Sequence, residues 1–471
     1  MPSLSTRASW SFRKVAVLPR REQSGALRSL SLDTSTGGIK TFISRSWSVS
    51  WPMTVIMLFE FLIGITDVYI AGRVGKEVQA TYGFVFQLYF IFIVIANALT
   101  VGTVSVVSRL FTSGQKDELN QAVYSSLATT AVAGIVLAVG GIFLTPLIIS
   151  VMNIPAELKR FVLPFVRIYA IGLIFHYLLI NSNGVLRSCN MIKKSLKTMS
   201  LVCLCNIGFN FLYVFHTPLG YRGIAAATAS SVFIGSIVNL IQIRTIINNE
   251  RTYSKAIVRR IINIGWPMGL NQALWQVGSM VLFLILSALP ENRVEVLAAL
   301  TTGLRIESAI FLPAFAFNMA NAVIIGNLLG QTKQDEAFRS GLVTATIGVL
   351  IVTGLVIAVI VNARWIASLL SHNEIVTREC VTYLYISLLS EPVMAWGIIL
   401  GGGLSGAGDT RSVLLRVALS VWLVRIPLSY LFVVVLGYGA TSVWWSMNVS
   451  QLVQAFFLSK RYLGKKWLTM P

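Results

Sequence analysis

Four acidic residues lie inside or beside long apolar segments: Glu60, Asp67, Glu307 and Glu391. A carboxylate in such surroundings is costly unless it has a partner, and it can take up a proton or bind a cation through its oxygens. Asp67 either faces the protein interior or offsets the nearby charge of Arg73 at the end of its segment. These acids therefore suggest chemistry with ions.

Patterns typical of enzymes do not accompany these acids. The three histidines are scattered, and neither H-E-x-x-H nor G-x-S-x-G occurs in the sequence. The stretch GGGLSGAGDTRS at 401–412 contains G-x-G-x-x-G, but apolar segments flank it where a dinucleotide fold needs a strand and a helix. We interpret its glycines as allowing a tight turn and close helix approach, with Asp409 or Thr410 capping the next helix. We expect no enzyme activity.

The composition is that of a membrane protein. Of the 471 residues, 55% are apolar and 12% are charged, about half the charged share of an average soluble domain. The net charge of +20 comes from basic residues in short segments between apolar runs. This distribution suits membrane orientation, and we expect no nucleic-acid partner.

The apolar segments have the length of about 20 residues that a helix needs to cross a bilayer. They predict an all-α polytopic membrane protein with twelve transmembrane helices, at 49–71, 80–106, 120–144, 160–182, 196–216, 223–245, 257–289, 296–328, 338–361, 379–404, 411–436 and 440–459. Most of the 38 Lys and Arg residues lie before the first helix, after the even-numbered helices and at the C-terminus. This bias predicts that both termini are cytoplasmic.

Three short motifs recur in the same order in the two halves of the chain. Trp-Pro-Met at 51–53 returns at 266–268, Gly-Val-Leu at 184–186 resembles Gly-Gly-Leu at 402–404, and Leu-Gly-Tyr at 219–221 returns at 436–438. Six helices separate the copies, so the halves should be related by an axis along the membrane normal. We therefore predict two pseudo-symmetric six-helix bundles and two tails: a basic, disordered N-terminal tail at 1–46, an N-lobe at 47–246, a C-lobe at 247–460 and a short basic C-terminal tail at 461–471.

These motifs resemble those of the multidrug and toxic compound extrusion (MATE) family of secondary transporters. GGGLSGAGDTR is similar to the family's G-x-L-R-G-x-G-D-T-R, with Ser405 where arginine is common. GVLRSCNMIKK keeps Arg187 but lacks the glycine and the aspartate. GITDVYIAGRVG at 64–75 resembles the end of the family's first helix, and GNLLGQ at 326–331 the end of its eighth. The resemblance covers about residues 47–460.

The resemblance places the family's first-helix aspartate on Asp67. It implies that Asn181, Asn206, Asn210 and Thr228 join this residue in a cation- or proton-coupling site, with Asp67 as a candidate Na⁺ ligand. Asn206 and Asn210 stand at i and i+4 on one helical face. Some relatives carry a second aspartate where this chain has Asn210, so the choice between Na⁺ and H⁺ stays open. The amides could instead only bond one helix to another.

Four more residues are weaker candidates. Glu60 precedes Asp67 on the same helical face, about 10 Å away, where relatives usually have glutamine. It either joins the coupling site or hydrogen-bonds a neighbour. Sodium-driven relatives of the family carry acids in their seventh and tenth helices. In this chain, Gln276 lies near the first of these positions and Glu391 lies one helical turn from the second, and Glu307 in the eighth segment is a further candidate. These C-lobe residues serve coupling or substrate binding, or they are structural.

The resemblance implies a secondary active antiporter that exports amphipathic or cationic organic compounds in exchange for H⁺ or Na⁺ by alternating access. The alternative is an exporter or flippase of a specific metabolite or lipid-linked precursor with the same architecture. We expect a multi-pass monomer in the lipid bilayer of the cell (inner) membrane, with no cofactor besides the coupling ion. The N-terminal 46 residues are a cytoplasmic tail, a targeting segment or an over-extended reading frame.

Overall fold

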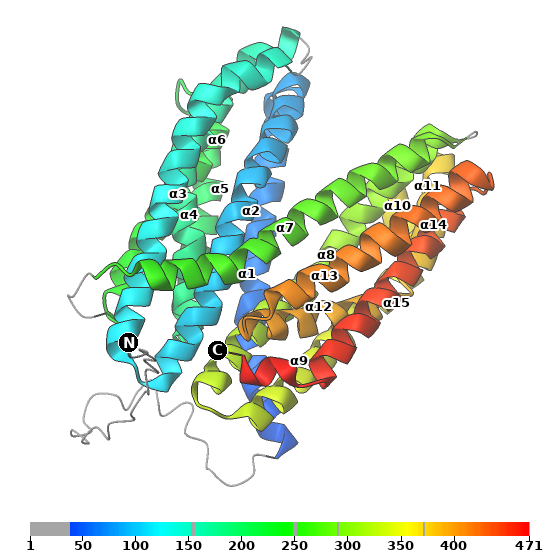
Figure 1. Ribbon diagram of the computed structural model, residues 1–471. Coiled ribbons are helices and arrows are strands. Elements are labelled where there is room, and N and C mark those ends of the chain that lie inside the picture. Colours follow the sequence, from blue (N-terminus) through cyan, green and yellow to red (C-terminus); the bar gives the residue numbers. More distant parts are fainter. Residues whose placement is uncertain (1–37, 152–155, 248–251, 290–291, 371–372, 471) are drawn as a thin grey trace, which may run out of the picture. The chain divides into compact units, whose positions relative to one another are not determined.

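The computed structural model describes residues 38–151, 156–247, 252–289, 292–370 and 373–470, and every regular element in them is a helix (Figure 1). Residues 1–37 of the predicted N-terminal tail lie outside the described residues. The first helix begins at Ile39, and residues 42–470 form one compact unit.

The N-terminal half contains six long helices that overlap the first six predicted segments. Their bounds are α1 Ile39–Val74, α2 Lys76–Ser113, α3 Lys116–Val151, α4 Ala156–Ser188, α5 Ile192–Phe215 and α6 Arg222–Ile243. Most extend beyond the apolar run at one end or both, because polar residues can continue a helix outside the hydrocarbon layer. A helix suits each segment because it satisfies the backbone hydrogen bonds internally, as a lipid environment requires.

The C-terminal half begins with three long helices and then becomes more broken. Its elements are α7 Lys255–Ser287, α8 Arg293–Gly330, α9 Gln334–Val361, α10 Ala363–Leu370, α11 Glu374–Ser387, α12 Glu391–Gly406, α13 Thr410–Ser420, η1 Val421–Arg425, α14 Ile426–Tyr430, η2 Leu431–Val435, α15 Thr441–Leu463 and η3 Lys466–Thr469. The short helix α10 lies between the ninth and tenth predicted segments.

In this half, two of the predicted transmembrane segments are not single regular helices. The tenth segment is α11 and α12, which meet at a bend of 57°. Pro392, in the first turn of α12, cannot donate a backbone hydrogen bond, which favours a break at this place. The eleventh segment contains two π-helical turns, η1 and η2, on either side of α14. In the described residues, ten helices are long and apolar enough to cross a membrane, or eleven with the bent pair.

The twelfth predicted segment is α15, which is not among those helices. It carries a row of buried polar side chains that lowers its mean hydropathy: Ser446, Asn448, Ser450, Gln451 and Gln454. These side chains pack against other helices instead of lipid, so the helix needs less apolar surface than an isolated span.

Each half has its own packed core. In the N-terminal half, α4 packs against α2, α3 and α6, and α5 packs against α6. In the C-terminal half, α12 packs against α8, α9 and α15. The helix α7 packs along α2 as well as against α13, so it contacts both halves. The two copies of the repeat are therefore joined chiefly through α2, which also packs on α8.

Along the glycine-rich stretch 401–408, α12 lies close against α8. A Cβ added to Gly402 would stand 2.2 Å from the backbone oxygen of Asn318, and one added to Gly406 would stand 2.1 Å from that of Ala322. Gly408 has φ +87° in the turn that follows, a conformation that favours glycine. The interpretation of these glycines as a tight turn with close helix approach therefore agrees with the structure.

The capping role expected for Asp409 or Thr410 was wrong. Asp409 occupies the N-cap position of α13, but its side chain makes no capping hydrogen bond. Its carboxylate instead forms an ion pair with Arg461 of α15, with 2.6 Å between Arg461 Nε and Asp409 Oδ2. The Thr410 hydroxyl is buried without a hydrogen-bond partner. A strong charge partner from a distant helix has thus drawn the aspartate away from its local backbone.

Candidate cation-binding site

Asp67 lies on the buried face of α1, together with Ile70 and Ala71, whereas the neighbouring Val68 and Tyr69 are exposed. Only 3% of Asp67 is accessible. Helical spacing thus directs the carboxylate into the N-terminal bundle while its neighbours in sequence face outward. The local sequence fixes this separation of faces, and packing decides what the carboxylate meets.

Three helices supply hydrogen-bond donors to the Asp67 carboxylate. Asn210 Nδ2 of α5 donates to Oδ1 over 2.8 Å, and Thr228 Oγ1 of α6 donates to Oδ2 over 3.0 Å. Tyr82 Oη of α2 lies 3.4 Å from Oδ2. Hydrogen bonds to a carboxylate are stronger than neutral ones, so these donors hold the carboxylate in a defined orientation.

The donors are also bonded to one another. Asn206 Nδ2 donates to Thr228 Oγ1 over 3.2 Å, and Asn210 Nδ2 lies 3.2 Å from Asn206 Oδ1. The i, i+4 spacing of the two asparagines places them one turn apart on α5. We call the set of Asp67, Tyr82, Asn206, Asn210 and Thr228 the Asp67 network.

Electrostatically, the Asp67 network has a negative group and no positive partner. None of the ion pairs among the described residues includes Asp67. Asn210 Oδ1 is buried without a hydrogen-bond partner, and the buried Tyr169 interacts electrostatically with Asp67. Carboxylate, amide and hydroxyl oxygens are the ligands that hard cations take, and the carboxylate can also accept a proton. The residues present therefore fit a small cation or a proton.

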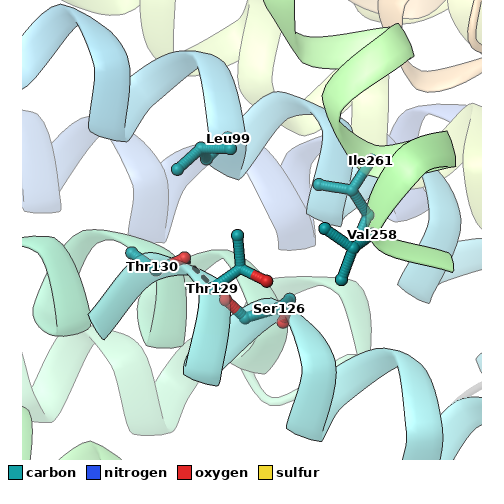
Figure 2. A pocket seen from close by; sticks show the side chains of 6 residues that line it. All are labelled: Leu99, Ser126, Thr129, Thr130, Val258 and Ile261. Carbon is teal, nitrogen blue, oxygen red and sulfur yellow. Dashed lines mark hydrogen bonds between the residues drawn. The ribbon is translucent and has the colours of Figure 1, made fainter. Parts of the chain in front are cut away.

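Asn181 does not belong to this network. Its Nδ2 donates to Thr130 Oγ1 of α3 over 2.6 Å, and no described hydrogen bond joins it to Asp67. Thr130 lines a small pocket between α2, α3 and α7, together with Leu99, Ser126, Thr129, Val258 and Ile261 (Figure 2). The side chains around it leave no room for even a water-sized group, so it is far smaller than a ligand site. We do not assign it to substrate.

Glu60 is also separate from the Asp67 network. It is exposed, and within the described part of the chain it forms no hydrogen bond or ion pair. Its strongest charge interaction is with Arg187, near the end of α4. The two acids share a face of α1, yet only Asp67 reaches the donors of α5 and α6.

The C-terminal half contains a second buried group of ionisable residues. Glu307 of α8 and Glu391, at the first turn of α12, are 3% and 0% exposed, and they interact electrostatically with each other and with Arg425. Arg425 Nε donates to Ser450 Oγ of α15 over 2.9 Å. Both carboxylate oxygens of Glu391 are buried without a hydrogen-bond partner. This group lies beside the bend between α11 and α12.

Gln276, the remaining C-lobe candidate, is exposed on α7 and has no described hydrogen bond to Glu307 or Glu391. Sequence reasoning did not assign Tyr82 or Arg425 to a site. Arg425 could have been found from its position inside an apolar segment, where a basic residue needs an acidic partner. Tyr82 offers no comparable signal, because aromatic residues are common throughout its helix.

A family model described as MatE matches residues 52–212 and again 267–431, which together make up more than half of the chain. The two matches begin at Pro52 and Pro267, the prolines of the repeated Trp-Pro-Met motif. The chain belongs to the MatE family of transporters. The repeated match explains the recurrence of short motifs, and membership makes the chain an integral, multi-pass membrane transporter.

Curated relatives of this MatE protein match it over nearly their whole length. It is 20% identical over 443 residues to the uncharacterized transporter YisQ of Bacillus subtilis, covering 91% of this chain and 95% of the relative. It is 22% identical over 432 residues to the probable multidrug resistance protein NorM of Bradyrhizobium diazoefficiens, covering 87% and 91%. These relatives support a transporter of the multidrug type.

Solved structures confirm the fold. A multidrug resistance MATE family transporter of the MOP superfamily, in an outward-facing conformation, superimposes with a TM-score of 0.85 at 19% identity, covering 95% of this chain and 100% of that one. The VcmN transporter of Vibrio cholerae, in its bent form, gives 0.84 at 17% identity, covering 91% and 97%. At these identities the likeness extends to the fold alone.

Proposed function

We propose that this MatE transporter is a secondary active antiporter that exports amphipathic or cationic organic compounds in exchange for H⁺ or Na⁺. The observation that carries the proposal is the Asp67 carboxylate. It is buried in an apolar bundle and held by three donors, yet it has no described cationic partner. Such a group is costly to keep charged in a membrane, and a bound cation or proton removes that cost.

In the proposed cycle, Asp67 exists in a loaded and an unloaded state. When unloaded, the carboxylate is stabilised by Asn210 and Thr228, whose donors already point at its two oxygens. When a proton or cation arrives, the charge is neutralised, and the amide of Asn210 can present its unpartnered Oδ1 in place of its Nδ2. The two states differ in their hydrogen bonds to α5 and α6, and this difference biases the alternation between the two halves.

We further propose that the chain lies in the cell membrane as a monomer with both termini in the cytoplasm. The distribution of Lys and Arg among the connecting segments supports this orientation. The proposed arrangement requires no cofactor other than the coupling ion.

For the C-terminal half, we propose that Glu307 and Glu391 are a secondary ionisable pair. Arg425 partly balances their charge. Glu391 also lies at the start of α12, where the helix dipole stabilises a negative charge. Both features make the pair less dependent on a mobile ion than Asp67.

The proposed function is tested by measuring efflux of ethidium, an aromatic organic cation, from proteoliposomes. A proton gradient and a sodium gradient are imposed separately, each with the other ion at equilibrium. We expect one of the two gradients to drive ethidium out against its concentration gradient, and that gradient identifies the coupling ion. Equal flux with and without both gradients would exclude an antiporter of this kind, and flux of a flavin or a lipid-linked sugar alone would favour the alternative cargo.

A substitution at Thr228 tests whether the network tunes ion binding. Thr228→Val removes a hydrogen bond to Asp67 Oδ2 and the acceptor of Asn206, while the side-chain shape is almost unchanged. We expect the ion concentration for half-maximal efflux to change about tenfold, since a hydrogen bond to a charged group contributes about 1.5–3 kcal/mol. Thr301→Val is the matched control, because that exposed hydroxyl bonds only to its own helix, at Leu297 O. An unchanged ion dependence would remove Thr228 from the site.

A further inference from the structure

Hydrogen bonds between the two halves are concentrated at one end of the helices. Among the described residues, those that join 42–247 to 252–470 come from two kinds of place: the first turns of α1, α3 and α9 and the residue before α7, and the last turns of α2, α4, α8 and α12, the residues just after these ends and the C-terminal tail. We call this the joint end, because it includes the glycine-rich stretch 401–408. In the orientation proposed above, the joint end is cytoplasmic.

Arg109, near the end of α2, makes the two shortest of these bonds that involve a charged group. Its Nη2 donates to the backbone oxygen of Ala407 over 2.7 Å, and its Nη1 donates to that of Met470 over 2.8 Å. Bonds from a guanidinium to carbonyl oxygens are charge-assisted and stronger than neutral ones. A single side chain of the N-terminal half thus holds two separate backbone segments of the C-terminal half.

Both acceptor segments are held in place by the C-terminal half itself. The segment that carries Ala407 is fixed by the ion pair between Asp409 and Arg461. The tail that carries Met470 is anchored by Trp467, which is fully buried and donates from Nε1 to the backbone oxygen of Tyr462 over 2.8 Å. The positions of the two carbonyl groups are therefore fixed within the C-terminal half, and Arg109 binds them where they already lie.

Close helix packing surrounds this contact. A Cβ added to Gly330 of α8 would stand 2.4 Å from the backbone oxygen of Arg109, and one added to Gly326 would stand 2.0 Å from Ser108 Oγ. These are the glycines of the GNLLGQ motif, and they let α2 and α8 approach closely at the joint end. Thr112 adds a hydrogen bond to the backbone oxygen of Asn327 over 2.8 Å.

From this geometry we infer that Arg109 and the C-terminal tail form a latch that closes the joint end and must release before the halves can separate there. The backbone oxygen of Met470, in the C-terminal tail at 466–470, accepts a hydrogen bond from Arg109 of α2, so the tail stabilises the closed arrangement. The inference rests on the two-half transport cycle proposed above, but it concerns a conformational equilibrium and not the identity of the ion or cargo. Opening the joint end breaks the charge-assisted bonds of Arg109, and variants that lack them should open more often.

The test measures the distance between spin labels across the joint end. Labels are placed at Asp117→Cys in α3 and Asp335→Cys in α9, two exposed positions, in a chain whose four native cysteines are replaced by alanine. We expect Arg109→Ala to raise the ratio of long to short distances at least roughly tenfold, because both charge-assisted bonds are lost. Deleting residues 465–471 should raise the same ratio by a smaller factor, since the Ala407 carbonyl remains.

The double variant distinguishes a latch from two unrelated defects. If the tail acts through Arg109, deleting the tail from Arg109→Ala should add no further change in the ratio. Arg73→Ala is the matched control, because Arg73 contacts Tyr69 of its own helix at the opposite end of α1 and should leave the distances unchanged. If Arg109→Ala does not yield monodisperse protein, the same distances are measured in Arg109→Lys instead. Lysine can reach only one of the two carbonyl groups, so the latch predicts a smaller rise in the same ratio. Unchanged distances in the Arg109 variant, or fully additive effects in the double variant, would overturn the latch, whatever the outcome of the efflux assay.

Discussion

Replacing Asp67 by Asn is expected to abolish ion-driven efflux while the protein still folds. The amide has nearly the same shape as the carboxylate, but it neither takes up a proton nor supplies a negative ligand to a cation. We expect efflux to fall to the level seen without an ion gradient, because the ion no longer has its site. The measurement is ethidium efflux from proteoliposomes under the gradient that drives the unsubstituted protein.

The physical basis of this expectation is the absence of a described positive partner for Asp67. If the carboxylate were only structural, the asparagine would keep most of its contacts and efflux would continue. Its Nδ2 group would oppose the Nδ2 of Asn210 or the hydroxyl of Thr228, and Asn210 can relieve this by turning its unpartnered Oδ1 toward it. We therefore expect a modest cost in stability beside a complete loss of coupling.

Two controls separate coupling from a general effect of lost charge. Asp117→Asn makes the same chemical change at an exposed acid of α3 and should leave efflux unchanged. Glu60→Gln tests the other acid of α1, which lies outside the Asp67 network, and should reduce efflux far less than Asp67→Asn. If Asp67→Asn still showed gradient-dependent efflux at the normal rate, the assignment of Asp67 to ion coupling would be refuted. If only Glu60→Gln lost that efflux, the coupling site would be assigned to Glu60 instead.

A single methyl group at Gly406 is expected to destabilise the fold strongly. In Gly406→Ala the new Cβ would lie 2.1 Å from the backbone oxygen of Ala322 and 2.6 Å from its Cα. Neither backbone atom can turn away as a side chain does, so α8 and α12 must separate. Overpacking of this kind costs about 1–3 kcal/mol or more, and for a chain of this length we expect Tm in detergent to fall by roughly 1–3 °C or more.

Gly354→Ala is the matched control for that substitution. Gly354 lies within α9, and a Cβ added there meets nothing within 4 Å. Alanine is the better helix former by about 1 kcal/mol, so Tm should stay the same or rise slightly. If both alanine variants melted at the same temperature, close approach of α8 and α12 could not be the reason for the glycine.

The sequence predicted the placement of helices well where a segment is uniformly apolar. Each of α1 to α9 overlaps its predicted range, because the requirement for about 20 apolar residues is local and can be read directly. The bend at Pro392 and the π-helical turns beside α14 were not predicted. Nor was the polar face of α15, since polar residues in a span are stable only against particular neighbours.

For the candidate site, the sequence determined which polar residues lie in apolar segments, and the family resemblance selected Asp67, Asn206, Asn210 and Thr228 among them. Only the tertiary structure decided that these four meet, that Tyr82 joins them, and that Asn181 turns instead to Thr130. The physical reason is the sequence distance over which each kind of information acts. Hydropathy and helical period depend on residues a few positions apart, whereas the bond from Thr228 to Asp67 spans 161 positions and depends on how whole helices pack.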